Sequence, residues 1–151
     1  LSLLVSVLPL VVEARNRIVV SKKELTLSVM SESGDVLYSC GIACGAGRGP
    51  KLSQGDNRTP EGKFSIVCIH DSRKWLYDSG NGVKVPHVYG PFFMRLGCPT
   101  ERWMSIGIHG TSSPRSIGSR CSHGCIRLNN RDLIEVVKFV EQGAECMILP
   151  D

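Results

Sequence analysis

The sequence predicts a mainly β domain with one helix close to its C-terminal end. Several short segments are rich in β-branched residues or alternate apolar with polar side chains, a period of two that is typical of half-buried strands. One later segment instead repeats Leu133, Val136, Val137 and Val140 at helical spacing. With 151 residues and 42% hydrophobic composition, the chain is long enough for one domain with a single core.

The expected strands share this composition and lie at residues 17–21, 25–29, 36–40, 63–69, 91–96, 103–108 and 145–149. Asn129 or Asn130 can cap the helix, and Gly143 can end it. Residues 45–57 form a glycine-rich loop that lacks the Gly-Lys-Ser/Thr ending of a phosphate loop. Residues 71–89 show little periodicity, and a segment this long is more often functional than not. We therefore expect it to form a mobile flap beside a cleft.

Residues 1–14 differ from the rest of the chain. They form an apolar run that ends in small residues at the positions read by a signal peptidase, and the run is shorter than the roughly 20 residues of a membrane span. We interpret residues 1–14 as a signal-peptide remnant and residues 15–151 as the catalytic domain. This interpretation predicts export to the periplasm or cell envelope. The alternative is a buried first strand or helix.

Net charge and cysteine content indicate which kinds of ligand the protein binds. The formal net charge is +4, and the basic residues are scattered, so no stripe for nucleic acid is expected. Seven cysteines are present, and an odd number leaves at least one thiol unpaired in an exported protein. Their spacing assigns no disulfide. Cys40 and Cys44 have no second pair that would complete a zinc site, so no metal is expected.

Two short motifs carry the chemistry, His109-Gly-Thr111 and Ser122-His-Gly-Cys125. A thiol needs a base within hydrogen-bond reach to act as a nucleophile near neutral pH, and a histidine at the end of a strand can provide it for Cys125. Gly124 allows the backbone to bend close to a substrate carbonyl. The amides of His123 to Cys125 can then converge on an oxyanion.

Together with their flanking residues, these motifs resemble the L,D-transpeptidase catalytic domain (YkuD type). The resemblance extends from Ile18 to Leu149 and is carried by Thr59-Pro-Glu-Gly-Lys-Phe64, Tyr89-Gly-Pro91, Ile106-Gly-Ile108-His109-Gly-Thr111, Ser116-Ile-Gly118 and Ser122-His-Gly-Cys-Ile-Arg-Leu128. It implies a β-sandwich-like or barrel-like domain with one helix after the catalytic turn.

The resemblance also implies roles for individual residues. Cys125 would be the nucleophile and His109 the base, with the main-chain carbonyl of Gly110 orienting the imidazole. The backbone around His123, Gly124 and Cys125 would form the oxyanion hole. Substrate contacts would come from Arg127, Ser122, Thr111 and Tyr89. No metal or cofactor is implied.

The implied substrate is the tetrapeptide stem of peptidoglycan. Cys125 would form a thioester with the third residue of the stem and release D-Ala, and an amine of a neighbouring stem would take up the acyl group. Carbapenems would acylate the same thiol.

Other interpretations use the same residues. Water can replace the amine, which gives an L,D-carboxypeptidase or an amidase. Further alternatives are a non-catalytic wall-binding module and a metallohydrolase that uses His70, His87, His109 and cysteines. Cys121 is not part of the motif. It can approach Cys125 in a tight turn and make the site redox-sensitive, pair with another cysteine, or stay unpaired.

Overall fold

The computed structural model describes residues 15–97 and 105–151. Its strands are β1 (Arg17–Ser21), β2 (Thr26–Met30), β3 (Val36–Gly41), β4 (Cys44–Gly45), β5 (Gly62–Asp71), β6 (Leu76–Asp78), β7 (Lys84–Pro86), β8 (Phe92–Gly97), β9 (Gly107–His109), β10 (Arg120–Ser122), β11 (Ile126–Arg127) and β12 (Glu145–Leu149). The helix α1 spans Asn130–Phe139, and a 3-10 turn, η1, spans Pro114–Ser116.

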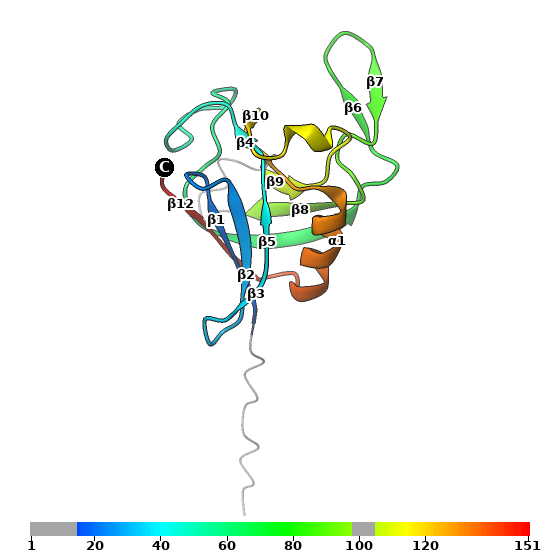
Figure 1. The fold of residues 1–151 in the computed structure, drawn as a ribbon. Coiled ribbons are helices and arrows are strands. Elements are labelled where there is room, and N and C mark those ends of the chain that lie inside the picture. The colour runs from blue at the N-terminus through cyan, green and yellow to red at the C-terminus, as the bar shows by residue number, and fades with distance from the viewer. Residues whose placement is uncertain (1–14, 98–104) are drawn as a thin grey trace, which may run out of the picture.

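Eight of these strands form one curled sheet in the order β11-β9-β8-β5-β12-β1-β2-β3 (Figure 1). Most neighbours are antiparallel, whereas β12 runs parallel to β1 and β11 runs parallel to β9. The short strands β4 and β10 form a separate pair, and so do β6 and β7. The predicted mainly β fold with one helix after the catalytic turn is confirmed.

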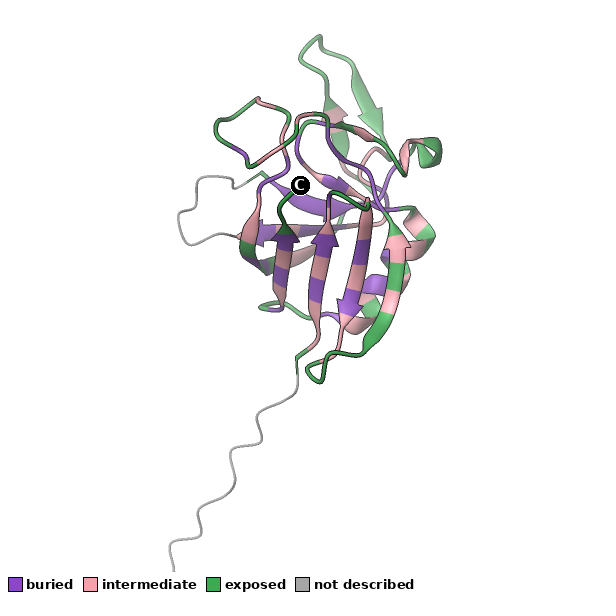
Figure 2. Ribbon diagram, turned by 60° about the vertical axis from the view of Figure 1, so that its left-hand side comes forward, coloured by how far each residue is buried: buried purple, intermediate pink, exposed green. Residues whose placement is uncertain are grey.

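Burial alternates along the strands in the way that the sequence pattern predicts. In β1 and β2 every second residue is buried, and Figure 2 shows this as alternating bands along the strands. Ile18 and Val29 pair across the two strands and are both fully buried. A strand with one face against a core has this period because successive side chains point to opposite faces.

Helix α1 packs its apolar side beside β3. Leu133 and Val136 are fully buried, and the Tyr38 hydroxyl donates a 2.6 Å hydrogen bond to Asp132. The helix ends at Phe139 and not at Gly143, because Val140 already has extended backbone angles (φ −121°, ψ 152°). Asn129 is the N-cap residue, and its side chain makes no capping hydrogen bond.

Several predicted elements differ in extent from the observed ones. The expected flap at residues 71–89 contains the β6–β7 hairpin, which projects from the body of the domain (Figure 1). The predicted strand at 103–108 lies partly outside the described residues, and its described part ends in β9. The two- and three-residue strands β4, β10 and β11 escaped prediction because so short a pairing has no periodicity of its own.

The predicted signal-peptide remnant at residues 1–14 lies outside the described residues. No helix in the described part of the chain is long and apolar enough to span a membrane.

A buried lysine, Lys22, connects the turn that follows β1 to the loop between β4 and β5. Lys22 is fully buried, and its Nζ lies 2.9 Å from Glu61 and 3.3 Å from Asp151. The same ammonium group donates hydrogen bonds to the carbonyls of Gly49 and Thr59, at 3.0 and 3.1 Å. Lys22 therefore anchors both ends of the segment that joins β4 to β5.

We expect Lys22→Met to lower the free energy of unfolding by about 3 kcal/mol, because it removes the cation from a buried charge cluster. Urea denaturation measures this loss. The matched control is the exposed neighbour Lys23→Met, which should change the free energy by less than about 0.5 kcal/mol. Equal effects of the two substitutions would contradict the anchoring role.

Candidate active site

The parallel pairing of β9 with β11 brings the two catalytic motifs together. Ile126 pairs with Ile108, and Arg127 pairs with His109. The Leu128 amide extends this pairing with a 2.9 Å hydrogen bond to the His109 carbonyl. Cys125 directly precedes β11, so the parallel register places it beside Gly107 at the start of β9, two residues before His109.

A network of short hydrogen bonds fixes the turn that presents Cys125. The Ser122 hydroxyl donates to the Cys125 carbonyl at 2.6 Å and accepts from the Gly124 amide at 3.1 Å. Thr59 Oγ1 donates to the Gly124 carbonyl at 2.8 Å. Gly124 has φ +141°, and a Cβ there would lie 2.9 Å from the Arg58 carbonyl oxygen. The turn therefore requires glycine at this position.

The sulfur of Cys125 lies against the backbone that leads into β9. It donates to the Ser105 carbonyl at 3.5 Å, and the Gly107 amide donates to it. Burial raises the pKa of the Cys125 thiol, while the Gly107 amide and the charges of Arg127 and Lys51 act in the opposite direction. Burial prevails, so the thiol is protonated near neutral pH.

His109 is held by two aromatic rings and one carbonyl. Its imidazole stacks on Phe93 with ring centroids 5.4 Å apart, and Tyr89 packs against it edge-on at 5.2 Å. Nδ1 lies 2.6 Å from the Gly110 carbonyl oxygen. A carbonyl can only accept, so Nδ1 carries the proton and Nε2 of the neutral ring is an acceptor.

Burial lowers the pKa of His109 to about 4; the Gly110 carbonyl opposes this effect, and Arg127 adds to it. A neutral imidazole thus accompanies a neutral thiol at pH 7. This arrangement suits a base that takes the thiol proton during the attack, instead of a preformed thiolate–imidazolium pair.

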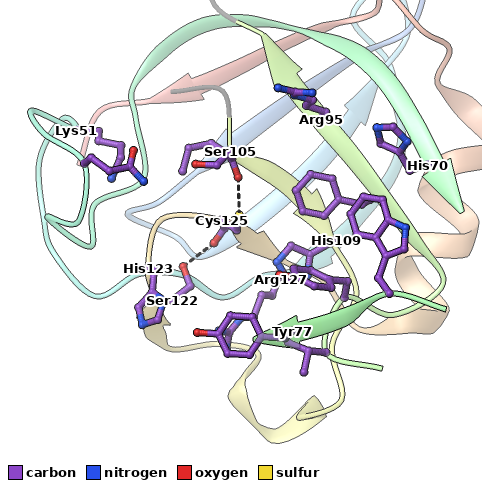
Figure 3. A pocket seen from close by; sticks show the side chains of 16 residues that line it. Lys51, His70, Tyr77, Arg95, Ser105, His109, Ser122, His123, Cys125 and Arg127 are labelled. Atoms are coloured by element: carbon purple, nitrogen blue, oxygen red, sulfur yellow. Dashed lines mark hydrogen bonds between the residues drawn. The ribbon is translucent and has the colours of Figure 1, made fainter. Parts of the chain in front are cut away.

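Cys125 and His109 open into one cavity of about 460 Å³ (Figure 3). Aromatic side chains form much of its wall, namely His70, Trp75, Tyr77, Tyr89 and Phe93. The polar part of the wall comprises Lys51, Gln54, Arg95, Ser105, Ser122, His123 and Arg127. Three of these side chains are cationic, and no carboxylate lines the cavity within the described part of the chain.

Sequence analysis missed the cation that the glycine-rich loop places in this cavity. Lys51 is 7% exposed, and its Nζ lies 2.8 Å from Asp56. Asp56 in turn accepts from the amides of Leu52 and Arg58, at 2.7 and 3.0 Å. The nearness of Lys51 to Thr59-Pro-Glu-Gly62, one of the motifs beside the site, was the available signal.

The predicted substrate-binding residues separate into two groups. Tyr89 and Arg127 line the cavity, as does His123. Ser122 also reaches the cavity wall, but it is 1% exposed and its hydroxyl is used within the catalytic turn. Thr111 does not line the cavity, and its Oγ1 accepts a 2.9 Å hydrogen bond from the Ser113 amide. Both hydroxyls make hydrogen bonds to backbone groups, and their contact with substrate stays a prediction.

The Gly124 amide donates to the Ser122 hydroxyl, and the oxyanion role of this backbone stays a prediction.

Cys121 is exposed, and its sulfur lies 3.7 Å from Nη1 of Arg127. The six cysteines of the described residues are free thiols. In the same part of the chain, no three His, Cys, Asp or Glu side chains are grouped in a way that could hold a metal ion.

Comparison with known proteins identifies the family. The family model of the L,D-transpeptidase catalytic domain matches residues 15–148. The chain belongs to this family. YkuD of Bacillus licheniformis, named as an L,D-transpeptidase, is 35% identical over 98 residues, which are 62% of this chain and 46% of that protein. The matched region is thus about half the length of this relative.

Solved L,D-transpeptidases have the same fold. The enzyme from Mycobacterium smegmatis superposes with a TM-score of 0.66 at 20% identity, covering 89% of this chain and 58% of that one. The LD transpeptidase LdtMt1, solved in complex with imipenem, gives a TM-score of 0.64 at 21% identity and covers 90% of this chain and 59% of its own. These similarities confirm the fold of the L,D-transpeptidase domain.

We expect Lys51→Met to raise the pKa of Cys125 further, because it removes a positive charge that favours the thiolate. Iodoacetamide alkylates the thiolate form of Cys125. As the pH is raised, the rate of this alkylation should therefore begin to increase at a higher pH in Lys51→Met than in the wild type. Lys63→Met removes one positive charge from an exposed site on β5 and serves as the matched control. Identical pH profiles for the wild type and Lys51→Met would contradict the electrostatic role of Lys51.

Proposed function

We propose that the protein is an exported L,D-transpeptidase that cross-links or remodels peptidoglycan through a thioester on Cys125. The observation that carries this proposal is the shared cavity of Cys125 and His109, with Nδ1 of His109 bound to Gly110. That bond leaves Nε2 as the acceptor for the thiol proton. A thiol beside a neutral imidazole acceptor is the arrangement that nucleophilic catalysis by cysteine requires.

In the first half-reaction, Cys125 attacks the carbonyl carbon of the third residue of the tetrapeptide stem. The thiol proton moves to Nε2 of His109 as the carbon–sulfur bond forms. The tetrahedral intermediate then collapses, its bond to the nitrogen of D-Ala breaks, and His109 protonates that nitrogen. D-Ala leaves, and a thioester remains on the enzyme.

Backbone amides and a nearby cation support the oxyanion of this intermediate. The Gly124 amide is engaged by Ser122, so the amides of His123 and Cys125 are the candidate donors. The Nζ of Lys51 lies 3.6 Å from the position that a Cβ of Gly124 would occupy. Its positive charge therefore lies on the Gly124 side of the turn, where negative charge would develop.

The positive charge of the cavity favours binding of an anionic acyl donor. Lys51, Arg95 and Arg127 line it, and none of its described wall is acidic. The tetrapeptide stem carries free carboxylates, and guanidinium groups bind carboxylates through paired hydrogen bonds. Arg127, which also lies opposite His109 in the sheet, is positioned to contact such a group.

In the second half-reaction, an amine of a neighbouring stem attacks the thioester. His109 accepts the proton of the amine and returns it to the departing sulfur. Water in place of the amine would give a trimmed stem, the outcome of an L,D-carboxypeptidase. Export is supported by the apolar run at residues 1–14, and fractionation of cells that produce the full chain tests it.

Incubation with purified disaccharide-tetrapeptide, followed by mass spectrometry of the products, tests the proposal. A cross-linked dimer that has lost one D-Ala is the expected product. A disaccharide-tripeptide alone would favour hydrolysis. Unchanged substrate at high enzyme concentration, with intact folded protein, would contradict both activities.

We expect Cys125→Ala to reduce turnover more than about a thousandfold, because the covalent route disappears with the nucleophile. The matched control is Cys68→Ala on β5. Cys68 Sγ lies 2.9 Å from Nε2 of His70, so this thiol contacts an imidazole, yet it does not line the cavity. The control variant should keep wild-type turnover. A loss of turnover in Cys68→Ala equal to that in Cys125→Ala would contradict the assignment of the nucleophile.

We expect a carbapenem to acylate the protein once, on Cys125, because its strained carbonyl is open to attack by a thiol. Mass spectrometry of the intact protein should show the addition of one carbapenem molecule, and peptide mapping should locate it. Cys68→Ala should still be modified, whereas Cys125→Ala should not. An adduct on another cysteine, or none after long incubation with titratable thiols, would count against the thioester mechanism.

A further inference from the structure

Asn130 is the first residue of α1, but its side chain makes a hydrogen bond to a residue outside the helix and distant in sequence. Its Oδ1 accepts a 2.8 Å hydrogen bond from the amide of Thr111, a residue 19 positions earlier in the sequence. The N-cap position belongs to Asn129. The Asn130 side chain thus leaves its own helix and binds the loop that follows His109.

The side-chain oxygen of Asn130 lies against two glycines, Gly90 and Gly110, where a side chain would block it. A Cβ on Gly90 or on Gly110 would overlap Oδ1, and a Cβ on Gly110 would also lie 2.9 Å from Cα of Gly90. The Gly110 amide donates to the Tyr89 carbonyl at 2.8 Å, which holds the two segments together. The close approach of the two glycines creates the slot that Asn130 fills.

The hydrogen bond to Asn130 and the hydrogen bond to His109 belong to the same peptide group. The Thr111 amide and the Gly110 carbonyl are the two ends of one planar unit, and in a trans peptide they point in opposite directions. Asn130 holds the N–H end at 2.8 Å, and the carbonyl end lies 2.6 Å from Nδ1 of His109. Fixing one end of a rigid plane fixes the direction of the other. A hydrogen bond to the N–H also polarises the carbonyl and makes it a stronger acceptor.

We propose that Asn130 is a positioning residue that acts through the Gly110–Thr111 peptide and keeps His109 in the tautomer with its proton on Nδ1. The consequence for catalysis, an Nε2 ready to accept the thiol proton, rests on the proposed function. The tautomer itself does not, because it is a property of the free protein.

The test compares Asn130→Ala, Asn130→Asp and Asn129→Ala with the wild type. Asn130→Ala leaves the Thr111 amide without its acceptor and frees the peptide to rotate. Asn130→Asp keeps an oxygen at the same place. Asn129→Ala alters the neighbouring residue, whose side chain makes no capping hydrogen bond, and therefore controls for effects on the start of the helix.

Nitrogen-15 NMR of the imidazole at pH 7 gives the first readout, with the His109 signals assigned by their loss in His109→Gln. The pKa of about 4 keeps the ring neutral at this pH, so the spectrum reports the tautomer directly. We expect protonated Nδ1 in the wild type, Asn129→Ala and Asn130→Asp, and a mixture of both tautomers in Asn130→Ala. In the wild type, the Thr111 amide should also be protected from hydrogen exchange.

Steady-state kinetics with disaccharide-tetrapeptide give the second readout. In Asn130→Ala, kcat should fall about tenfold to a hundredfold with little change in KM, since a misplaced catalytic group costs up to about this much. Asn130→Asp should recover most of the loss. An inactive wild type with the expected tautomers would contradict the proposed function and leave the role of Asn130 supported.

Three results would overturn the role of Asn130. The first is a folded Asn130→Ala protein whose tautomer and kcat match those of the wild type. The second is an equal loss of the Nδ1 tautomer in Asn129→Ala, which would indicate an effect on the helix. The third is an unprotected Thr111 amide in the wild type, which needs no variant and remains informative if Asn130→Ala does not fold.

Discussion

The active site depends on the parallel contact between β9 and β11. This contact pairs Ile108 with Ile126 and His109 with Arg127, and both isoleucines are fully buried. A shift by one residue would turn the side chains of β11 to the opposite face and move Cys125 away from His109. The burial of two apolar side chains thus favours this register, and the register sets the spacing of Cys125 and His109.

Burial at this contact also determines the chemistry of the resting site. Removing water disfavours charge on both groups, so it raises the pKa of Cys125 and lowers that of His109 to about 4. Nearby cations and the Gly107 amide only partly oppose the effect on the thiol. Both groups are therefore neutral in the resting site, and the proposed mechanism requires a proton transfer as the carbonyl is attacked. This makes the direction of the imidazole nitrogens decisive, and the Gly110 carbonyl controls it.

Segments distant in sequence hold that carbonyl and the catalytic turn in place. Asn130, from the helix, binds the Thr111 amide. Thr59, from the loop that Lys22 anchors, binds the Gly124 carbonyl in the turn. Each makes a hydrogen bond to backbone and not to a catalytic side chain. The catalytic geometry is consequently a property of the packed domain, in which α1, the glycine-rich loop and the sheet meet around Cys125.

The sequence by itself determined the mainly β fold, the strand β1 at its observed bounds, the single helix and the family, because a period of two, a helical repeat and a continuous motif are local properties. It also indicated Cys125 and His109, since their motifs are short and contiguous. Only the tertiary structure placed Lys51 in the cavity and turned Ser122 and Thr111 toward backbone partners. Those positions are set by contacts across many residues of the chain, such as Thr111 with Asn130, and no local pattern of side chains encodes them.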